Sequence, residues 1–244
     1  MTTNIGLARS YGRSAEEKRP TVITRNFIEN AAGSCLIETG KTKVLCTCTI
    51  DERVKAWRKG SGLGWITAED AMLPASTNTR SNRERANRQG RSMEIERLIG
   101  RSLRAAVDMA GLGGETTFNI DCDVLQADGG TRTASITGAW IALHDAIEFW
   151  RSAGKMKGNP ILSQVAAISV GMVNGRVLCD LDYQEDSHAE VDLNLVMNSE
   201  GKIIEVQGTG EQLAFGRDKL NRMLDVGEAG IKQLLEEQLK AIGQ

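Results

Sequence analysis

Histidine is scarce in this chain, with only His144 and His188 among 244 residues. Many hydrolases with a serine or cysteine nucleophile use a histidine base held beside it, and neither histidine lies in a motif of that kind. His144 follows Leu143 on an apolar helical stretch, and His188 lies inside a run of acidic residues, so we interpret both as non-catalytic. The chain is therefore poorly equipped for the chemistry of a histidine-based hydrolase.

The cysteines lack the spacing of a metal site. They form no C-x-x-C pair, and neither histidine is near Cys46 and Cys48 in the sequence. Each cysteine lies in an apolar, strand-like run, which favours reduced core thiols over zinc ligands. Reduced thiols are typical of a cytoplasmic protein, and we expect that location. The five cysteines are Cys35, Cys46, Cys48, Cys122 and Cys179.

Long hydrophobic runs and an excess of charge are also absent. No run approaches the roughly 18 apolar residues that a membrane span needs, and the first residues lack the apolar segment of a signal peptide. We therefore expect no contact with a membrane. The formal net charge is −2, from 30 basic and 32 acidic residues. Overall charge thus predicts no nucleic-acid partner, and any RNA binding must come from local basic patches.

The most informative stretch, Asn119–Gly138, begins with the alternation of a half-buried strand. A turn with Gly129 and Gly130 follows, and the apolar residues then recur at helical spacing. Gly130, Thr131 and Arg132 lie where the turn meets the helix. Unpaired N–H groups, a positive dipole end and an arginine favour a phosphate-sized anion there. The stretch matches neither common nucleotide-binding loop, and a capped helix with nothing bound is the alternative.

A second arginine stands at a predicted helix start within residues 80–104, which hold eight arginines against three glutamates. Arg80 and Arg83 lie where no apolar periodicity is visible, which predicts an exposed loop, either a solvated surface or an RNA contact. The helical pattern that follows puts Arg91 beside the cap residue Ser92. Two such helix N-termini can converge on one anion, whereas the alternative for Arg91 is a solvated side chain.

Acidic residues are concentrated within thirteen positions of the later part of the chain. Asp192 alternates with apolar residues in a predicted strand, and Asp186, six positions earlier, shares its face in an extended run. Two carboxylates, completed by water and substrate oxygens, suit Mg²⁺ or Mn²⁺. An acidic turn beside a solvated strand is the alternative, and Asp180 is a weaker candidate that acts through water or an arginine. The cluster comprises Asp180, Asp182, Glu185, Asp186, Glu190 and Asp192.

The order of predicted elements is strands, helix, strand, helix, four strands and then helices, which differs from the strict alternation of a doubly wound sheet. Apolar runs continue on both sides of the turn at Gly154–Pro160, so we predict one domain over residues 1–244. Residues 1–20 are polar and basic, and we expect them to form a mobile lead-in. Asn174 and Gly175 predict a hairpin. The tail predicts a helix over Arg217–Ile242 that is broken near Gly227–Gly230.

Several long strings resemble the ribonuclease PH family, bacterial 3′-to-5′ exoribonucleases that cut RNA with phosphate instead of water. The most specific string is D-C-D-V-L-Q-A-D-G-G-T-R-T-A-S-I-T-G-A, at residues 121–139, and the resemblance covers nearly the whole chain. Further matching strings are G-W-I-T-A-E (64–69), G-R-S-M-E-I-E-R-L-I-G-R (90–101), A-A-I-S-V-G (166–171), E-D-S-H-A-E-V-D (185–192) and I-I-E-V-Q-G-T-G-E (203–211).

The resemblance implies an α+β domain with a mixed β-sheet and packed helices. It implies a transfer-RNA nucleotidyltransferase that trims transfer-RNA 3′ ends, and processes ribosomal RNA, with inorganic phosphate as co-substrate. It also implies a homohexameric ring built as a trimer of dimers. In the family's motif the aspartates that hold the metal match Asp186 and Asp192. The catalytic candidates are thus Arg91, Arg132, Asp186 and Asp192, with Gly130 and Thr131 also binding phosphate and Arg80 and Arg83 binding RNA.

Two positions depart from the family pattern G-W-I-T-A-E-Y-x-M-L-P-R. Asp70 stands where the aromatic residue is expected, and Ala75 where the arginine is expected. These departures concern one RNA or subunit contact rather than the chemistry. A ring subunit that only binds RNA, or one that binds phosphate only for stability, is the alternative. Related subunits without activity lack the phosphate-site arginine or the paired aspartates, all of which are present here.

Overall fold

The structure of the chain is a computed structural model that describes residues 9–83, 90–212 and 214–244. The first sheet has the order β1-β2-β3-β5-β4, and it is mixed because β4 runs parallel to β5 while the other pairs are antiparallel. Its strands are β1 (Thr21–Arg25), β2 (Gly33–Thr39), β3 (Thr42–Asp51), β4 (Trp65–Met72) and β5 (Thr117–Gln126).

A second, antiparallel sheet has the order β7-β6-β8-β9. Its strands are β6 (Val165–Val173), β7 (Arg176–Cys179), β8 (Val191–Asn198) and β9 (Ile203–Gly210). Asn174 and Gly175 join β6 to β7 with positive φ angles of 51° and 71°, which confirms the predicted hairpin. The α+β class is also confirmed, and its strands are divided between two sheets, of which only the first is mixed.

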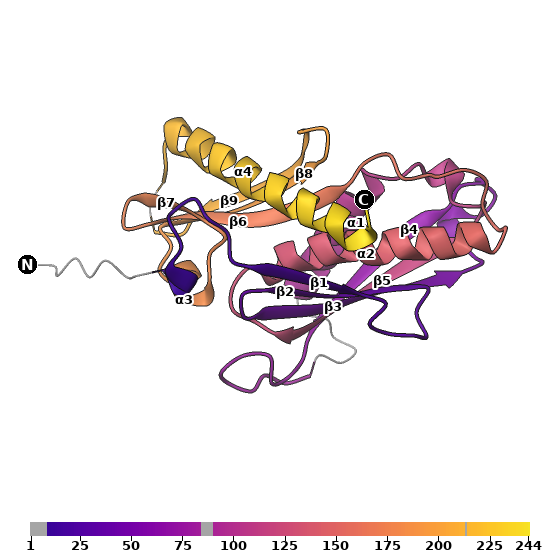
Figure 1. Cartoon of the computed structure of the whole chain (residues 1–244), viewed down its shortest axis with the longest axis horizontal. Helices are drawn as coiled ribbons and strands as arrows, with labels where there is room; N and C mark the ends of the chain where they lie inside the picture. The colour runs from indigo at the N-terminus through magenta and orange to yellow at the C-terminus, as the bar shows by residue number, and fades with distance from the viewer. Residues whose placement is uncertain (1–8, 84–89, 213) are drawn as a thin grey trace, which may run out of the picture.

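Four α-helices and three short 3₁₀ helices complete the described residues. Figure 1 shows α2 over the first sheet and α4 across the second, with α3 at the end where the chain begins. The α-helices are α1 (Gly90–Arg104), α2 (Thr131–Ser152), α3 (Tyr183–Asp186) and α4 (Arg217–Ile242), and the 3₁₀ helices are η1 (Ser10–Gly12), η2 (Ala56–Arg58) and η3 (Met109–Gly111).

Strand β6 has two buried faces, which explains its nearly continuous apolar run. Val165 and Ala167 join the core around α2, which also packs on β2, β3 and β5. Ile168 and Val170 face the opposite way and join the core under α4. Helix α2 is therefore enclosed between the first sheet and β6, and its sequence is apolar on most sides for that reason.

The predicted break in the C-terminal helix is wrong, because α4 runs without interruption from Arg217 to Ile242. Its two inner glycines allow close contact with the second sheet instead. A Cβ atom on Gly227 would lie 2.8 Å from Leu195 Cδ2, and one on Gly230 would lie 2.5 Å from Ile168 Cδ1. Packing against the sheet thus outweighs the low helix propensity of glycine.

The expectation of a mobile lead-in is wrong for residues 9–20, and residues 1–8 lie outside the described residues. Arg13 is 8% exposed and Arg19 is completely buried. Both arginines form ion pairs with acidic residues beyond β7. These partners are far away in the chain, so the local sequence could not predict the pairing. Charged side chains tolerate such burial only when they are paired and hydrogen-bonded.

All five cysteines are buried and none is in a disulfide, which confirms the prediction of core thiols. Cys46 faces Cys122 across β3 and β5, with their sulfur atoms 3.8 Å apart. Burial raises the pKa of Cys48 well above its ordinary value, so this thiol stays protonated at neutral pH. None of the helices in the described ranges combines the length and the apolar character that spanning a bilayer requires.

Candidate active site

The turn before α2 adopts the shape that the two glycines predict. Gly129 and Gly130 have φ angles of 75° and 64°, and Gly130 is the N-cap of the helix. A Cβ atom on Gly129 would lie 2.5 Å from the Leu181 carbonyl oxygen, so only glycine fits against the segment after β7. Thr131 and Arg132 are the first two helical residues. Their backbone N–H groups have no acceptor inside the helix, as at any helix start.

Arg91 brings the start of α1 to the start of α2. It is the second residue of α1, and its Nη2 donates a hydrogen bond to Thr131 Oγ1 at 3.2 Å. Its Nη1 lies 4.0 Å from Oδ2 of Asp70, a buried carboxylate of β4 at the position where the family has an aromatic residue. The two helix N-termini that the sequence singled out therefore meet.

Arg132 forms an ion pair with Glu94, an acidic residue that the sequence analysis did not select. Its Nη1 lies 3.6 Å from Glu94 Oε1, and the same oxygen accepts a hydrogen bond from Gln207 Nε2 at 3.1 Å. Glu94 lies one helical turn after Arg91, on α1, so its spacing from a candidate residue was the signal that could have identified it. The phosphate candidate Arg132 thus faces an anionic side chain in the described structure.

Asp186 and Asp192 form the predicted acidic pair. Asp186 ends α3, and Asp192 is the second residue of β8. Burial, the charge of Asp186 and that of Glu211 raise the pKa of Asp192 to about 6, and Arg132 opposes the shift. Burial also raises the pKa of Asp186, again against the charge of Arg132. The two carboxylates, Glu211 and Arg132 are therefore close enough for their charges to interact.

This acidic pair fits a divalent cation that keeps water and substrate oxygens as ligands. Asp186 is exposed and Asp192 is half-buried, and two neighbouring carboxylates whose ionised forms repel each other are stabilised by a hard cation between them. In the described ranges no group of three or more acidic, histidine or cysteine side chains is arranged as a complete cage. An open site of two carboxylates is the arrangement that Mg²⁺ favours beside substrate phosphates.

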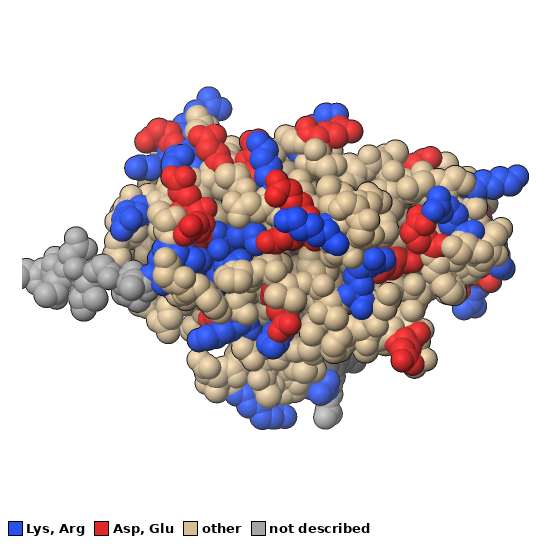
Figure 2. Space-filling view, viewed as in Figure 1, with Lys and Arg blue, Asp and Glu red and all other residues tan. Residues whose placement is uncertain are grey.

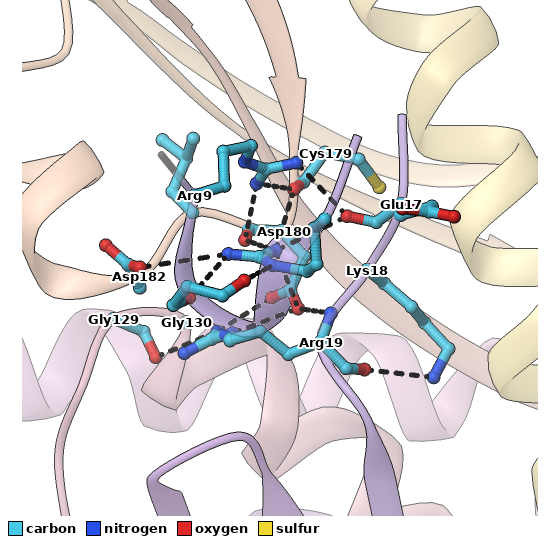
Figure 3. Close-up of polar contacts among 12 residues, drawn as sticks. Arg9, Glu17, Lys18, Arg19, Gly129, Gly130, Cys179, Asp180 and Asp182 are labelled. Carbon is cyan, nitrogen blue, oxygen red and sulfur yellow. Dashed lines mark hydrogen bonds and ion pairs between the residues drawn. The ribbon is translucent and has the colours of Figure 1, made fainter. Parts of the chain in front are cut away.

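Arginines from the N-terminal segment hold the acidic segment in place, and Figure 3 shows how they converge. Arg9 Nε donates to Glu185 Oε1 at 2.6 Å, and Arg13 Nη2 donates to Glu185 Oε2 at 3.3 Å. Asp182 and Glu185 form a capping box at the start of α3. The sequence placed Asp180 near an arginine, and the structure identifies its partner as Arg19.

Arg80 and Arg83 lie in the loop after β4, and both are exposed as predicted. Arg80 donates to Asn82 Oδ1 at 3.5 Å. Burial raises the pKa of Asp123 and the charge of Arg83 opposes this, so Arg83 lies near β5. No contact within the described residues joins either arginine to the phosphate candidates. The neighbouring arginines at 85 and 88, assigned to the same loop from the sequence, fall outside the described residues.

Comparison with known proteins matches nearly the whole chain to one family. Models described as "3' exoribonuclease family, domain 1" and "domain 2" match residues 17–147 and 163–230. A ribonuclease PH from Mycobacterium ulcerans (strain Agy99) is 55% identical over 237 residues, which cover 96% of this chain and 91% of that protein. One from Corynebacterium glutamicum (strain R) is 53% identical over 245 residues, covering both chains completely. The family is described in two parts, and the prediction of one domain over residues 1–244 is not tested by these matches and stays a prediction.

Solved structures share the fold at low identity. An Archaeoglobus fulgidus exosome with RNA bound to the active site has a TM-score of 0.81 and 22% identity, over 95% of this chain and 92% of that one. Rice (Oryza sativa) Rrp46 has a TM-score of 0.76 and 19% identity, over 94% and 98% of the two chains. The long, highly identical matches confirm the resemblance that the sequence motifs predicted. The chain belongs to the 3′ exoribonuclease family, and ribonuclease PH proteins are among its relatives.

Proposed function

We propose that the chain is a phosphate-dependent 3′-to-5′ exoribonuclease that trims the 3′ ends of transfer-RNA precursors in the cytoplasm. A phosphate oxygen forms a bond to the phosphorus of the last linkage of the RNA. The bond from that phosphorus to the 3′ oxygen of the preceding nucleotide breaks, and this oxygen takes up a proton. The terminal nucleotide leaves as a nucleoside 5′-diphosphate. Ribonuclease PH relatives with 53–55% identity support this activity.

One observation supports the mechanism most directly: the charge of Arg132, at the start of α2, acts to lower the pKa of both Asp186 and Asp192, so the three groups are within electrostatic range. Inorganic phosphate is already nucleophilic at neutral pH, so the protein needs to hold two anions together rather than to supply a strong base. Arg132, Thr131 and the Gly130 backbone bind the incoming phosphate at the helix start. Arg91, which already contacts Thr131, completes the site from α1.

Asp186 and Asp192 are the residues that would hold Mg²⁺ or Mn²⁺. When bound, the cation supplies positive charge that stabilises developing negative charge on phosphate and leaving-group oxygens. The positive charge of Arg132 then reduces the repulsion between two anionic groups, the carboxylate pair and the incoming phosphate. Release of Arg132 from Glu94, 3.6 Å away, frees its guanidinium for the phosphate.

RNA contact and assembly complete the proposal. Arg80 and Arg83 bind the RNA backbone from their exposed loop. Basic and acidic side chains are interspersed over the face in Figure 2, so this face offers no broad basic surface, and we propose the exposed loop as the contact. The working form is a homohexameric ring, a trimer of dimers, because several such loops around a pore make a positive funnel for one strand. Light scattering of the active fraction tests the hexamer, and a fully active monomer contradicts it.

The deciding experiment incubates the protein with a 3′-tailed RNA and Mg²⁺, with and without inorganic phosphate. Chromatography is expected to show nucleoside diphosphates only when phosphate is present. Nucleoside monophosphates formed equally well without phosphate would indicate hydrolysis and reject the mechanism. RNA binding without any cleavage would favour the alternative of a ring subunit that only binds RNA.

A further inference from the structure

Among the described residues, Arg19 is the largest fully buried side chain, with none of its surface exposed. It lies between η1 and β1, outside both sheets. A guanidinium removed from water is tolerated only when acceptors surround it. The reason for its burial must therefore be sought in the groups that it joins.

On one side Arg19 holds the start of the acidic segment. Its Nε donates to Asp180 Oδ2 at 3.0 Å, and its Nη2 donates to Asp180 Oδ1 at 2.7 Å. The backbone N–H of Arg19 also donates to Asp180 Oδ2, at 2.6 Å. Asp180 has a φ angle of 54°, in the left-handed region, so its backbone is held by these contacts in an uncommon conformation. Helix α3, which ends with Asp186, begins three residues later.

On the other side the same guanidinium holds the turn before α2 (Figure 3). Its Nη1 donates to the Asp128 carbonyl oxygen at 2.5 Å, and its Nη2 lies 3.4 Å from the Gly129 carbonyl oxygen as a second donor. A Cβ atom on Gly130 would lie 3.0 Å from Arg19 Nη2, so the side chain packs directly against the N-cap. Arg19 therefore touches the turn that presents Thr131.

The turn extends from the first sheet, and the acidic segment extends from the second. One planar side chain bonds to both, and its fork geometry sets their separation. We propose that Arg19 is a positioning residue for phosphorolysis, which together with Asp180 sets the distance between the phosphate-binding turn and the carboxylates on α3 and β8. This inference rests on the site assigned under the proposed function. A displacement of about 1 Å at a reacting centre can cost roughly 10²-fold in rate.

The test compares Arg19→Lys with Arg25→Lys. Lysine keeps the positive charge but cannot form the two-pronged contact. Arg25 is a matched control because its Nε and Nη2 make an equivalent fork with Asp145, at 2.9 and 2.6 Å, on α2 beyond its start. We expect Arg19→Lys to lower kcat/KM for phosphate about 100-fold, with RNA affinity measured without phosphate unchanged. Arg25→Lys is expected to lower thermal stability while its kcat and phosphate KM stay normal.

Asp180→Asn provides a second route to the same answer. We expect it to reproduce the loss seen in Arg19→Lys, and the double variant to be no worse than either single one, because the two residues act as a unit. A folded Arg19→Lys protein with normal kcat and phosphate KM overturns the inference. If Arg19→Lys does not fold, the same readouts in Asp180→Asn decide. Normal phosphate dependence in Arg132→Ala would instead show that the proposed site is wrong, which distinguishes the two failures.

Discussion

Arg91 and Arg132 meet different partners at the two helix starts. Arg91 donates to the hydroxyl of Thr131, whereas Arg132 lies 3.6 Å from Glu94 and within electrostatic range of Asp186. A hydroxyl can donate to a phosphate while still accepting from an arginine. Glu94 is an anion and competes with phosphate for Arg132. In the proposed mechanism, phosphate therefore has to displace a carboxylate from Arg132.

Replacing Arg132 by alanine is expected to reduce the rate by roughly 10²–10³, because a preorganised charge-assisted donor to the reacting phosphate is lost. RNA affinity is expected to change little, since the proposed partner of this residue is the phosphate nucleophile rather than the RNA. Rate and RNA affinity are measured side by side over low and saturating phosphate. Arg176→Ala, at an exposed position of the β6–β7 hairpin, is the control. A near-normal rate at every phosphate concentration would remove Arg132 from the site.

Asp186→Asn and Asp192→Asn are each expected to raise the Mg²⁺ concentration needed for activity. Asparagine keeps the shape of the side chain but loses the charge that a hard cation requires. Titrating Mg²⁺ against activity gives the half-activating concentration for each variant. An unchanged requirement in both variants would place the metal elsewhere, and Glu211→Gln is the next variant to titrate, because the charge of Glu211 acts on both aspartates.

The raised pKa of Asp192 also predicts that the stability of the metal-free protein depends on pH. Burial and the charge of Asp186 raise its pKa to about 6, above the value of about 3.9 expected in the unfolded chain. Ionisation therefore disfavours the folded state, and the penalty grows from about pH 4 and is complete above pH 6. Asp192→Asn is expected to raise the melting temperature at pH 7 but hardly at pH 4. Equal shifts at both pH values would contradict the assigned cause.

Helix α4 shows how two effects of glycine compete within one element. Replacing Gly230 by alanine gains about 1 kcal/mol of helix propensity, but the new Cβ would lie 2.5 Å from Ile168 Cδ1 and 2.8 Å from Cys179 Sγ. Overpacking typically costs about 1–3 kcal/mol. We therefore expect Gly230→Ala to lower the free energy of unfolding, as measured by denaturant titration.

The paired variant Gly230→Ala with Ile168→Val isolates the steric cause. Valine lacks the Cδ1 atom that the new methyl group would meet, so the double variant is expected to recover part of the loss caused by Gly230→Ala. The valine change alone costs about 0.5–1.5 kcal/mol in a core. Simple addition of the two losses would show that Ile168 does not limit the approach of α4.

At the scale of the whole molecule, the candidate site lies where the two sheets meet. The first sheet contributes the starts of α1 and α2, and the second contributes the carboxylates on α3 and β8. In the proposed mechanism, the helix starts bind the phosphate and the carboxylates bind the cation, so both sheets are needed to hold the two side by side. The exposed loop with Arg80 and Arg83 follows β4, which is parallel to β5 and ends at the same edge of the first sheet as the turn before α2.

The double variant Arg80→Ala with Arg83→Ala is expected to weaken RNA binding with little dependence on sequence. Loss of two phosphate contacts should flatten the salt dependence, by about 0.7 in the logarithmic slope for each contact to a single strand. Binding titrations at several salt concentrations measure both quantities. If affinity and slope are unchanged, the loop is a solvated surface and the RNA contact lies elsewhere.

Short-range patterns by themselves determined much of this protein. The strand, glycine turn and helix of Asn119–Gly138, and the hairpin at Asn174, depend on alternation and turn residues that act between neighbours in the chain. The motif strings identified the family because many matched residues in order are specific without any knowledge of distances. The position of Arg132 at a helix start also followed from local sequence alone.

Only the tertiary structure decided which charges meet. The burial of Arg19 against Asp180, the contact of Arg132 with Glu94 and the continuity of α4 all depend on groups distant in the chain. From sequence alone, a basic stretch such as residues 9–20 is predicted to be exposed to solvent, because charged residues are mostly exposed. Arg13 and Arg19 of this stretch are buried because the acidic segment after β7 supplies the acceptors that a guanidinium requires when it leaves water.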